Sequence, residues 1–544
     1  MDFPVRLLHK SLRPLPVTAL PMSLADAITY SLLLGAGLAL AAIIWSYGRG
    51  LRNSPRDLWL LFAYKVVEYS AYAATNLAVI LWLTRDCGLG DVAAGSVISA
   101  WSISLSVMGM FAGALVDTIG IRRTMIVSVF FLIFSRAASV FLTAPVPVFI
   151  FVLLPLGIGF AIVAPVISVA IKRYTTKEGA ALGFGLFYVV MNLAFAAGGL
   201  FFDWIREHHA SRDAAGKILD ENAGTTLLGV HFSTYQMIFL WALGATCVSL
   251  LLTFVVRDGV EMTDSGEVVV HPPGEAKGSG RAAIRKAAGE TWAAIATTFR
   301  ERFFWIYMGL LSLTLFVRFV FFHFHYTFPK YGIRVLGEGA KIGSIYGVLN
   351  PVLIVFLVPL VAALTKKTSS YKMMIWGSAI SSLACFLATM PASWFAGLTG
   401  TVAGELIFVK WLRMAPDLPA LMAAPPVPEY WPLILFILIF TIGEAVWSPR
   451  LMQFTAEIAP HGREGTYIAL SVLPFFVAKF FVGPMSGWLV STYTPVDAAG
   501  KAMASYPEHH MVWVWIGGTA LLSPIGLLLF RRWFLKNTAH HEST

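Results

Sequence analysis

Thirteen long apolar runs constrain the fold of this chain more than any other feature of its sequence. Each run is long enough, at about 1.5 Å per helical residue, to cross a hydrocarbon core of about 30 Å. The strands of a membrane barrel would be about half as long and would alternate in polarity. The sequence therefore predicts an all-α polytopic membrane protein, with spans near 24–45, 57–83, 91–115, 123–143, 146–171, 181–204, 234–256, 303–327, 341–365, 371–391, 431–456, 465–491 and 509–530.

Composition supports the same class of protein. Hydrophobic residues make up 57% of the chain and charged residues only 13%, which lies outside the usage of soluble domains. The net charge of +10 would need a basic face on a soluble domain to indicate nucleic acid, and the sequence offers no such domain. The three cysteines are scattered without ligand spacing, so neither a disulfide framework nor a metal site is predicted.

The first apolar run, at 24–45, has two interpretations. A secretory signal is one of them, because basic residues precede the run. The run is long for such a signal, however, and no small-residue cleavage site precedes Tyr47. We favour a retained extra N-terminal helix, and the sequence leaves open whether this helix crosses the membrane.

Loop charge gives the orientation and the domain organisation. More than half of the 40 Lys and Arg residues fall in alternate loops and in the C-terminal tail, which places the linker at 257–302 and the C-terminus in the cytoplasm of a plasma membrane or a bacterial inner membrane. Two six-helix halves around a cavity are typical of an alternating-access carrier. We predict an N-terminal tail with the extra helix (1–56), a first six-helix bundle (57–256), the cytoplasmic linker (257–302), a second six-helix bundle (303–532) and a cytoplasmic tail (533–544).

A polar stripe interrupts the second run. Lys65, Glu68, Tyr69, Tyr72 and Asn76 fall on one side of a helix at spacings of three and four residues. Ionisable groups at mid-bilayer cost roughly 2.5–3.5 kcal/mol each on insertion scales, so they normally face partners or a water-filled cavity. The stripe predicts a shared polar cavity between helices.

A short motif lies between the next two spans, in the stretch Gly113-Ala-Leu-Val-Asp117-Thr-Ile-Gly120-Ile-Arg122. Glycines permit a tight turn and a close helix approach, and the aspartate can cap a helix or pair with an arginine. The stretch is similar to the cytoplasmic signature of the major facilitator superfamily. That resemblance implies a major facilitator fold of 6+6 transmembrane helices, with Gly113, Asp117, Gly120 and Arg122 as its conformational motif.

Other stretches resemble the proton-coupled oligopeptide transporter family within that superfamily. They are Phe187-Tyr188-Val-Val-Met191-Asn192 in one span, Leu349-Asn350-Pro351 in another, and Gly443-Glu444-Ala-Val-Trp447 in a third. The polar stripe also aligns, but only Glu68 and Tyr72 persist: Lys65 stands where the family has an acid, and Ala164 stands where it has a lysine. The resemblance implies a divergent relative with altered coupling and an altered solute.

Charges within the spans indicate the kind of solute. Two acids, Glu68 and Glu444, face four bases, and this leaves a surplus of +2 if all six line the cavity. Such a surplus favours a solute with a carboxylate or phosphate group. We expect Arg136, near the outer half, to contribute least, because it can belong to a loop or a lipid headgroup. The four bases are Lys65, Arg136, Arg318 and Lys479.

The pairing of these charges is less constrained. With a tyrosine at position 69 in place of the family's arginine, we predict a pair between Glu68 and Arg318 that joins the two bundles. Two alternatives stay open: Arg318 reaches the outer interface alone, and Lys65 neutralises Glu68 on its own helix. Glu444 can hold a solute amine, carry a proton, or pair with Lys479 to tie two helices together.

The functional hypothesis is a secondary active transporter of a small polar or anionic, peptide-like solute, coupled to protons. We assign proton coupling or gating to Glu68, Glu444 and Arg318. A receptor, scaffold or lipid-handling module on the same fold is the competing class, and an integral membrane enzyme is a weaker one because no catalytic motif is present. No cofactor or nucleic acid is expected, the bilayer is the expected surrounding, and the oligomeric state stays open. The predicted solute-binding residues are Lys65, Tyr72, Tyr188, Asn192, Asn350, Glu444 and Lys479.

Overall fold

The computed structural model describes residues 23–270, 289, 297–458, 470–471, 473–498 and 500–538, while the side chains of 110–115, 117, 118, 164, 452, 456–458 and 538 fall outside that description. Thirteen helices in the described part of the chain are long and apolar enough to cross a membrane. This number equals the predicted one, and the predicted all-α polytopic fold is confirmed. The chain separates into two compact units, Ile44–Phe395 with Val427–Thr544, and Met1–Ile43 with Ala396–Pro426.

The first six core spans of the larger unit are continuous or nearly continuous helices. The last turn of α3 stops at Gly120, whose φ of 85° is a conformation that glycine adopts without strain. A capping box at Ser233 and Gln236 starts the sixth span. The spans are α2 (Arg56–Arg85), α3 (Asp91–Ile119), α4 (Ile121–Phe141), α5 (Pro145–Pro147) continuing through a π-helical turn (Val148–Leu153) into α6 (Leu154–Tyr174), α7 (Lys177–His209) and α8 (Thr234–Val255).

The last six core spans contain more breaks. A short helix, α11 (Phe328–Leu336), follows the first of them, and a π-helical turn (Gly343–Val348) opens the second. The start predicted for the span at 465–491 lies outside the described residues. The helices are α10 (Arg302–Tyr326), α12 (Leu349–Leu364), α13 (Ser370–Ala384) with a 3₁₀ turn (Cys385–Thr389), α16 (Tyr430–Ile458), α18 (Leu473–Tyr493) and α19 (Met511–Leu529), followed by the short α20 (Arg531–Thr538).

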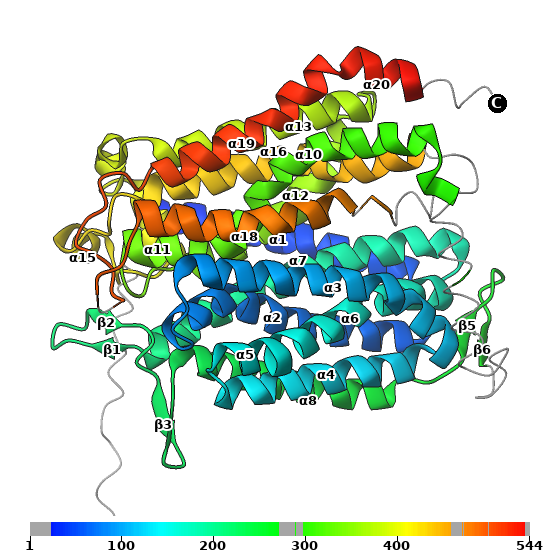
Figure 1. The fold of residues 1–544 in the computed structure, drawn as a ribbon, viewed down its shortest axis with the longest axis horizontal. Coiled ribbons are helices and arrows are strands. Elements are labelled where there is room, and N and C mark those ends of the chain that lie inside the picture. The colour runs from blue at the N-terminus through cyan, green and yellow to red at the C-terminus, as the bar shows by residue number, and fades with distance from the viewer. Residues whose placement is uncertain are drawn as a thin grey trace, which may run out of the picture. The chain divides into compact units, whose positions relative to one another are not determined.

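Six short strands form antiparallel hairpins outside the spans. β1 (Ser211–Arg212) pairs with β2 (Ile218–Asp220), and β3 (Thr225–Leu227) pairs with β4 (Val230–Phe232), all between α7 and α8. β5 (Val260–Met262) and β6 (Val268–Val270) open the linker. The core helices run roughly parallel to one another, with α11 and β1–β4 at one end and β5–β6 at the other (Figure 1). We call these the α11 end and the linker end.

The smaller unit contains most of α1 (Leu24–Gly50) and the segment that precedes α16. A bend of 96° separates the turn at Ala392–Leu398 from the segment Val402–Trp411, which consists of α14 (Val402–Gly404) and a π-helical turn (Glu405–Trp411). A short helix, α15 (Leu418–Ala423), follows. Within this unit the ammonium of Lys410 lies 2.6 Å from the carboxylate of Asp26, so an ion pair joins the beginning of α1 to the bent segment.

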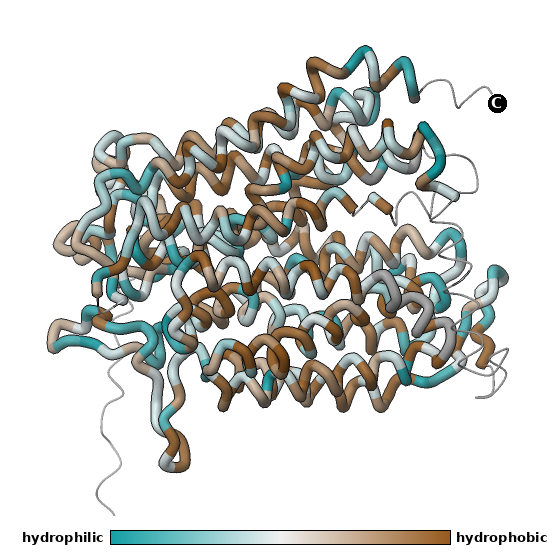
Figure 2. Tube along the Cα trace, in the orientation of Figure 1, coloured by the Kyte–Doolittle hydropathy of each residue, from teal (hydrophilic) through white to brown (hydrophobic). Residues whose placement is uncertain are grey.

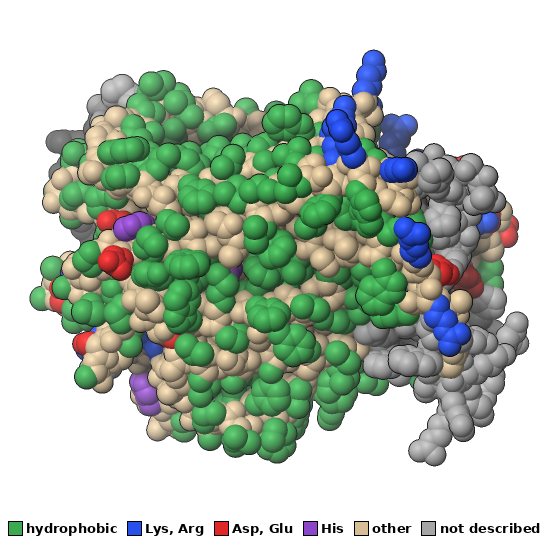
Figure 3. Space-filling view, turned by 45° about the horizontal axis from the view of Figure 1, so that its top comes forward, with side chains coloured by type: hydrophobic (Ala, Val, Ile, Leu, Met, Phe, Trp, Pro, Cys, Tyr) green, Lys and Arg blue, Asp and Glu red, His purple; other side chains and the backbone are tan. Residues whose placement is uncertain are grey.

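The surface of the spans is apolar. Long hydrophobic stretches occupy the helices, and the hydrophilic residues concentrate in the connections at both ends (Figure 2). Figure 3 shows one face on which hydrophobic side chains cover the middle, while Lys and Arg gather towards the linker end. Such a belt is the surface that a hydrocarbon core requires, and the protein is an integral membrane protein.

Two of the helix contacts that join the first six core spans to the last six bring glycines together near the α11 end. α3 packs on α18, and α7 packs on the π-helical turn before α12. Glycines stand at both contacts: a Cβ on Gly199 would lie 2.7 Å from the carbonyl oxygen of Gly343, and a Cβ on Gly95 would overlap the carbonyl of Gly483. Backbones therefore touch at these two places, which we call the glycine seams.

Candidate solute-binding site

A buried carboxyl group from α16 forms the first part of the candidate site. Glu444 accepts a hydrogen bond of 2.7 Å from the side-chain amide of Asn350 on α12. The same amide donates to the hydroxyl of Thr441, 3.0 Å away and one helical turn before Glu444. Only 9% of Glu444 is exposed. The amide therefore fixes the position of the carboxyl group without supplying a charge.

Groups from both sets of spans surround this carboxyl. Arg318 of α10 is close enough to Glu444 to interact with it electrostatically, and so are the phenols of Tyr188 on α7 and Tyr346 before α12. The guanidinium of Arg318 lies 5.0 Å from the centre of the Phe321 ring. Arg318 and Tyr188 are half-buried, so neighbouring side chains do not cover this polar cluster completely. With Asn350, it contains four of the predicted site residues, Glu444, Asn350, Arg318 and Tyr188.

Lys479 joins α18 to α3 rather than to Glu444. Its ammonium donates to the carbonyl oxygen of Ser102 at 3.0 Å and to the hydroxyl of Ser106 at 2.6 Å. The considered pair between Lys479 and Glu444 is therefore wrong. Both acceptors are neutral, so among the described residues no carboxylate neutralises this ammonium.

Glu68 pairs with a different arginine from the one predicted. Its carboxylate lies 2.6 Å from the guanidinium of Arg136 on α4, and both side chains are fully buried. Arg136 also bonds the hydroxyl of Thr246 and the carbonyl of Ala242 on α8. The predicted Glu68–Arg318 pair is wrong, and so is the assignment of Arg136 to a loop or headgroup, because Arg136 points into the first six helices.

Lys65 has neither the partner nor the surroundings that the stripe suggested. Its ammonium is fully buried and has no hydrogen-bond partner among the described residues. It lies 4.7 Å from the centre of the Tyr69 ring and also contacts the ring of Phe187. The alternative in which Lys65 neutralises Glu68 is not realised, since Glu68 pairs across to α4. The stripe therefore separates into distinct environments instead of facing one cavity.

Tyr72 and Asn192 complete the predicted set. The ring of Tyr72 packs edge-on against Phe160 with centres 4.3 Å apart, so much of its surface serves packing. The amide of Asn192 donates to the carbonyl oxygen of Tyr188 on its own helix at 2.9 Å. Neither side chain joins the hydrogen bonds around Glu444.

The conformational motif lies at the linker end. Gly120 separates α3 from α4, and Arg122 donates to the carbonyl oxygen of Phe254 on α8 at 3.2 Å. The side chain of Asp117 and the surroundings of Gly113 lie outside the described residues, so the predicted role of this motif stays a prediction.

Ion pairs that the sequence did not predict cross between the two sets of spans at the α11 end. Asp91, at the start of α3, holds Lys330 at 3.1 Å and Arg334 at 2.9 Å, and both bases come from α11. Burial lowers the pKa of Lys330 to about 8; Asp91 opposes this shift and Arg334 adds to it. Arg85 of α2 pairs with Glu338.

A second group of contacts lies beside these pairs. Arg206 near the end of α7 bonds Glu221 and donates to the carbonyl oxygen of Ala340 at 2.9 Å. Glu221 accepts from the backbone amide of Gly339 at 3.0 Å. Burial would raise the pKa of Glu221, but the charge of Arg206 holds it below its ordinary value. We call the ion pairs of Asp91, Arg85 and Arg206 the α11-end lock. Charges at span ends were the only sequence signal for it.

The fold and these contacts define a class, that of helical membrane transporters. A family model for the Major Facilitator Superfamily matches residues 60–412, more than half of the chain, and the chain belongs to this superfamily. The predicted membership is thereby confirmed. Among the described residues, no three His, Cys, Asp or Glu side chains are grouped as a metal site requires.

Solved structures of oligopeptide transporters share the fold. A POT family transporter in complex with 5-aminolevulinic acid is 15% identical, with a TM-score of 0.60, over 88% of this chain and 97% of that chain. A POT family transporter in complex with a thioalcohol-conjugated peptide is 15% identical, with a TM-score of 0.60, over 89% of this chain and 99% of that chain. A peptide transporter POT in complex with sulfate is 15% identical, with a TM-score of 0.60, over 89% of this chain and 96% of that chain. No curated protein sequence matches the chain.

Proposed function

We propose that this protein is a secondary active transporter that moves a small polar or anionic, peptide-like solute by alternating access, coupled to protons. The observation that carries the proposal is the polar cluster of Glu444, Asn350, Arg318 and Tyr188, which draws on both sets of spans. Binding there would bring the two sets together around the solute. The similar structures hold 5-aminolevulinic acid, a conjugated peptide and sulfate, and these ligands support the solute class.

The charge balance inside the spans supports an anionic group on the solute. Glu68 and Arg136 neutralise each other, and Glu444 lies beside Arg318. The ammonium of Lys479 remains without a carboxylate partner among the described residues, whereas Lys65, which also lacks one, is fully buried against aromatic rings. A carboxylate or phosphate on the solute would supply the missing negative charge.

The contacts at the α11 end support alternating access. Two glycine seams and the α11-end lock close this end between the two sets of spans. Glycine contacts and hydrogen-bonded ion pairs can separate without disturbing the interior of either set. We propose that the α11 end faces the outside and that the linker and the C-terminus lie in the cytoplasm of a plasma membrane or a bacterial inner membrane, with bundles at 57–256 and 303–532 as the moving bodies.

Glu444 is the better candidate for proton coupling of the two buried acids. Its hydrogen-bond partner is a neutral amide, and Arg318 interacts with it electrostatically without a direct ion pair, so protonation of the carboxyl group breaks no direct ion pair. Protonation of Glu68 would remove the partner of Arg136, which is costly in a buried site. Glu68 then serves to hold α2, α4 and α8 together.

Proton flux in liposomes tests the proposal. The purified chain is reconstituted, and internal pH is followed while dipeptides, organic acids or inorganic phosphate are added outside. If the protein is a carrier, at least one solute should acidify the liposome interior. Glu444→Gln should abolish this proton flux, and the matched surface variant Glu508→Gln should keep it. A receptor or scaffold would bind solute without any flux, and flux that survives Glu444→Gln would overturn the coupling role.

A further inference from the structure

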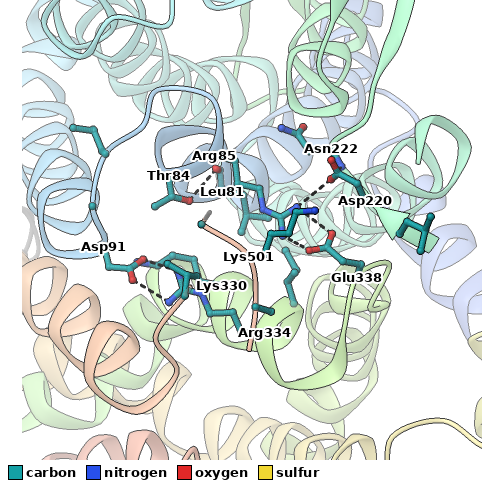
Figure 4. Close-up of a pocket in the computed structure, with 17 residues that line it drawn as sticks. Leu81, Thr84, Arg85, Asp91, Asp220, Asn222, Lys330, Arg334, Glu338 and Lys501 are labelled. Carbon is teal, nitrogen blue, oxygen red and sulfur yellow. Dashed lines mark hydrogen bonds and ion pairs between the residues drawn. The ribbon is translucent and has the colours of Figure 1, made fainter. Parts of the chain in front are cut away.

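A cavity of about 530 Å³ lies at the α11 end, apart from the cluster around Glu444. The end of α2, the start of α3, α11 and the loop at 496–502 form its walls. Its volume is in the range of small-molecule sites. Figure 4 shows the charged side chains that line it: the Asp91 group on one side, the Arg85 group on the other, and Lys501 labelled between them.

The walls carry more positive than negative charge. Four bases and three acids line the cavity, which leaves a surplus of one positive charge. The bases are Arg85, Lys330, Arg334 and Lys501, and the acids are Asp91, Asp220 and Glu338.

Most of the carboxylate oxygens are already occupied. Asp91 accepts from Lys330 and from both terminal nitrogens of Arg334. Glu338 takes Arg85 on both oxygens and also accepts from the backbone amide of Glu221. Asp220 lies 3.6 Å from Arg85. Among the described residues, Asp220 is the one carboxylate of the lining with an oxygen that has neither an ion pair nor a hydrogen bond.

The ammonium of Lys501, unlike most of these carboxylates, has no charged partner among the described residues. Lys501 is exposed and lines the cavity. Lys330 bonds a single carboxylate oxygen, so two of its three donors have no carboxylate to bind. In the part of the chain that the structure describes, the unused hydrogen-bonding groups of the charged walls are therefore mostly donors, from Lys501 and Lys330.

We propose that this cavity is a binding site for a small anion that carries a carboxylate or phosphate group, with Lys501 and Lys330 as its donors. The site is separate from the proposed transport site, and its occupation does not depend on transport. Because Lys330 also holds Asp91 across the α3–α11 contact, an anion bound here shares the Lys330 ammonium with Asp91. The lock and the anion thereby share this cation.

The test uses the full chain in detergent and inorganic phosphate as the probe. The unfolding temperature is followed against phosphate at constant ionic strength, for the wild type, Lys501→Gln, Lys501→Arg and the exposed control Lys217→Gln, which lies in the β1–β2 turn. We expect a saturable rise in the wild type and in Lys217→Gln. Lys501→Gln should raise the half-saturating concentration roughly three- to tenfold, as loss of one partly screened charge does, and Lys501→Arg should restore it within about twofold.

Further arms separate the sources of the anion. If the ligand is a free solute anion, the phosphate response also appears in phosphatidylcholine vesicles. If it is a lipid headgroup, phosphatidylglycerol stabilises the protein in a Lys501-dependent way and phosphate adds nothing further. Either result supports the site. An identical phosphate response in the wild type and Lys501→Gln overturns it, as does a response that Lys479→Gln removes and Lys501→Gln keeps. Neither result bears on proton flux, so the proposed function stands or falls separately.

Discussion

Glu68 and Arg136 neutralise each other inside the first six core helices, so the charges that remain available lie elsewhere in the spans. Arg136 seemed peripheral because it lies near the outer half of its span in the sequence. The structure turns its guanidinium inward to Glu68 and Thr246. Sequence spacing places a residue on a face of its own helix, but which neighbour that face meets depends on helix packing, and one sequence does not give the packing.

Removal of one partner of this buried pair should destabilise the protein. Glu68→Gln leaves the guanidinium of Arg136 buried without a counter-ion, which costs about 3 kcal/mol or more. The unfolding temperature in detergent should fall in Glu68→Gln and in Arg136→Gln. The double variant should recover much of the loss, because no charge stays unpaired. Additive losses in the double variant would contradict this interpretation.

Lys330 gives the α11 end a dependence on pH whose sign can be worked out. Its pKa is about 8 in the closed structure, lowered first by burial, and it returns towards about 10.4 when water reaches the ammonium. The open form therefore binds more protons between these values, and raising the pH from 7 to 9.5 should favour the closed form. Arg334 stays charged in this window, and burial raises the pKa of Tyr506 nearby, so that phenol stays neutral.

Distances between spin labels at Ala214→Cys and Met503→Cys, in a Cys247→Ser background, report this closure by pulsed electron paramagnetic resonance. The shorter distance should gain population as the pH rises, and Lys330→Gln should remove the dependence while Lys217→Gln keeps it. A shift towards longer distances would show that the ion pair with Asp91 outweighs the burial of the ammonium.

At the scale of helices and strands, the sequence predicted where the membrane spans lie but did not predict which helices contact one another. A run such as Thr234–Val255 is predictable because its apolar length is a local property. The π-helical turn at Gly343–Val348 and the short α11 depend on what packs beside them. Gly199 and Gly343 are in contact although they are far apart in the chain, and the sequence around each glycine does not indicate which residue it contacts. The lock residue Asp91 was likewise visible only as a charge at a span end.

A bulky side chain in a glycine seam should hold the α11 end open. A Cβ added to Gly199 would lie 2.7 Å from the Gly343 carbonyl oxygen, which is too close for a carbon atom. Gly199→Leu should therefore force α7 away from the turn before α12. The same spin labels should then report a longer distance and transport should stop, while Gly244→Leu, at a position with no atom within 4 Å, should leave both unchanged. A wild-type distance in Gly199→Leu would mean that this seam does not need to close.

For the whole molecule, the α11-end lock and the polar cluster belong to one arrangement. The lock holds the two sets of spans together at one end, and the cluster lies between them deeper in the protein. This arrangement predicts a division of labour in which lock variants shift the balance between closed and open forms, whereas cluster variants change solute binding and proton flux. The length of the apolar runs predicted the membrane fold, whereas this difference between lock and cluster could be inferred only from contacts between distant parts of the chain.

Removing the lock should therefore open the α11 end without damaging the solute site. Asp91→Asn together with Glu338→Gln deletes the carboxylates that hold Lys330, Arg334 and Arg85. The double variant should show a second, longer peak in the spin-label distance, because the remaining contacts there, chiefly the glycine seams and the hydrogen bonds of Arg206 and Glu221 to the backbone at 339–340, are fewer. It should bind solute as the wild type does. Asp26→Asn, which removes the ion pair to Lys410 within the smaller unit, is the matched control and should leave the distance distribution unchanged. An unaltered distribution in the double variant would show that the ion pairs of Asp91 and Glu338 do not set the balance between the two forms.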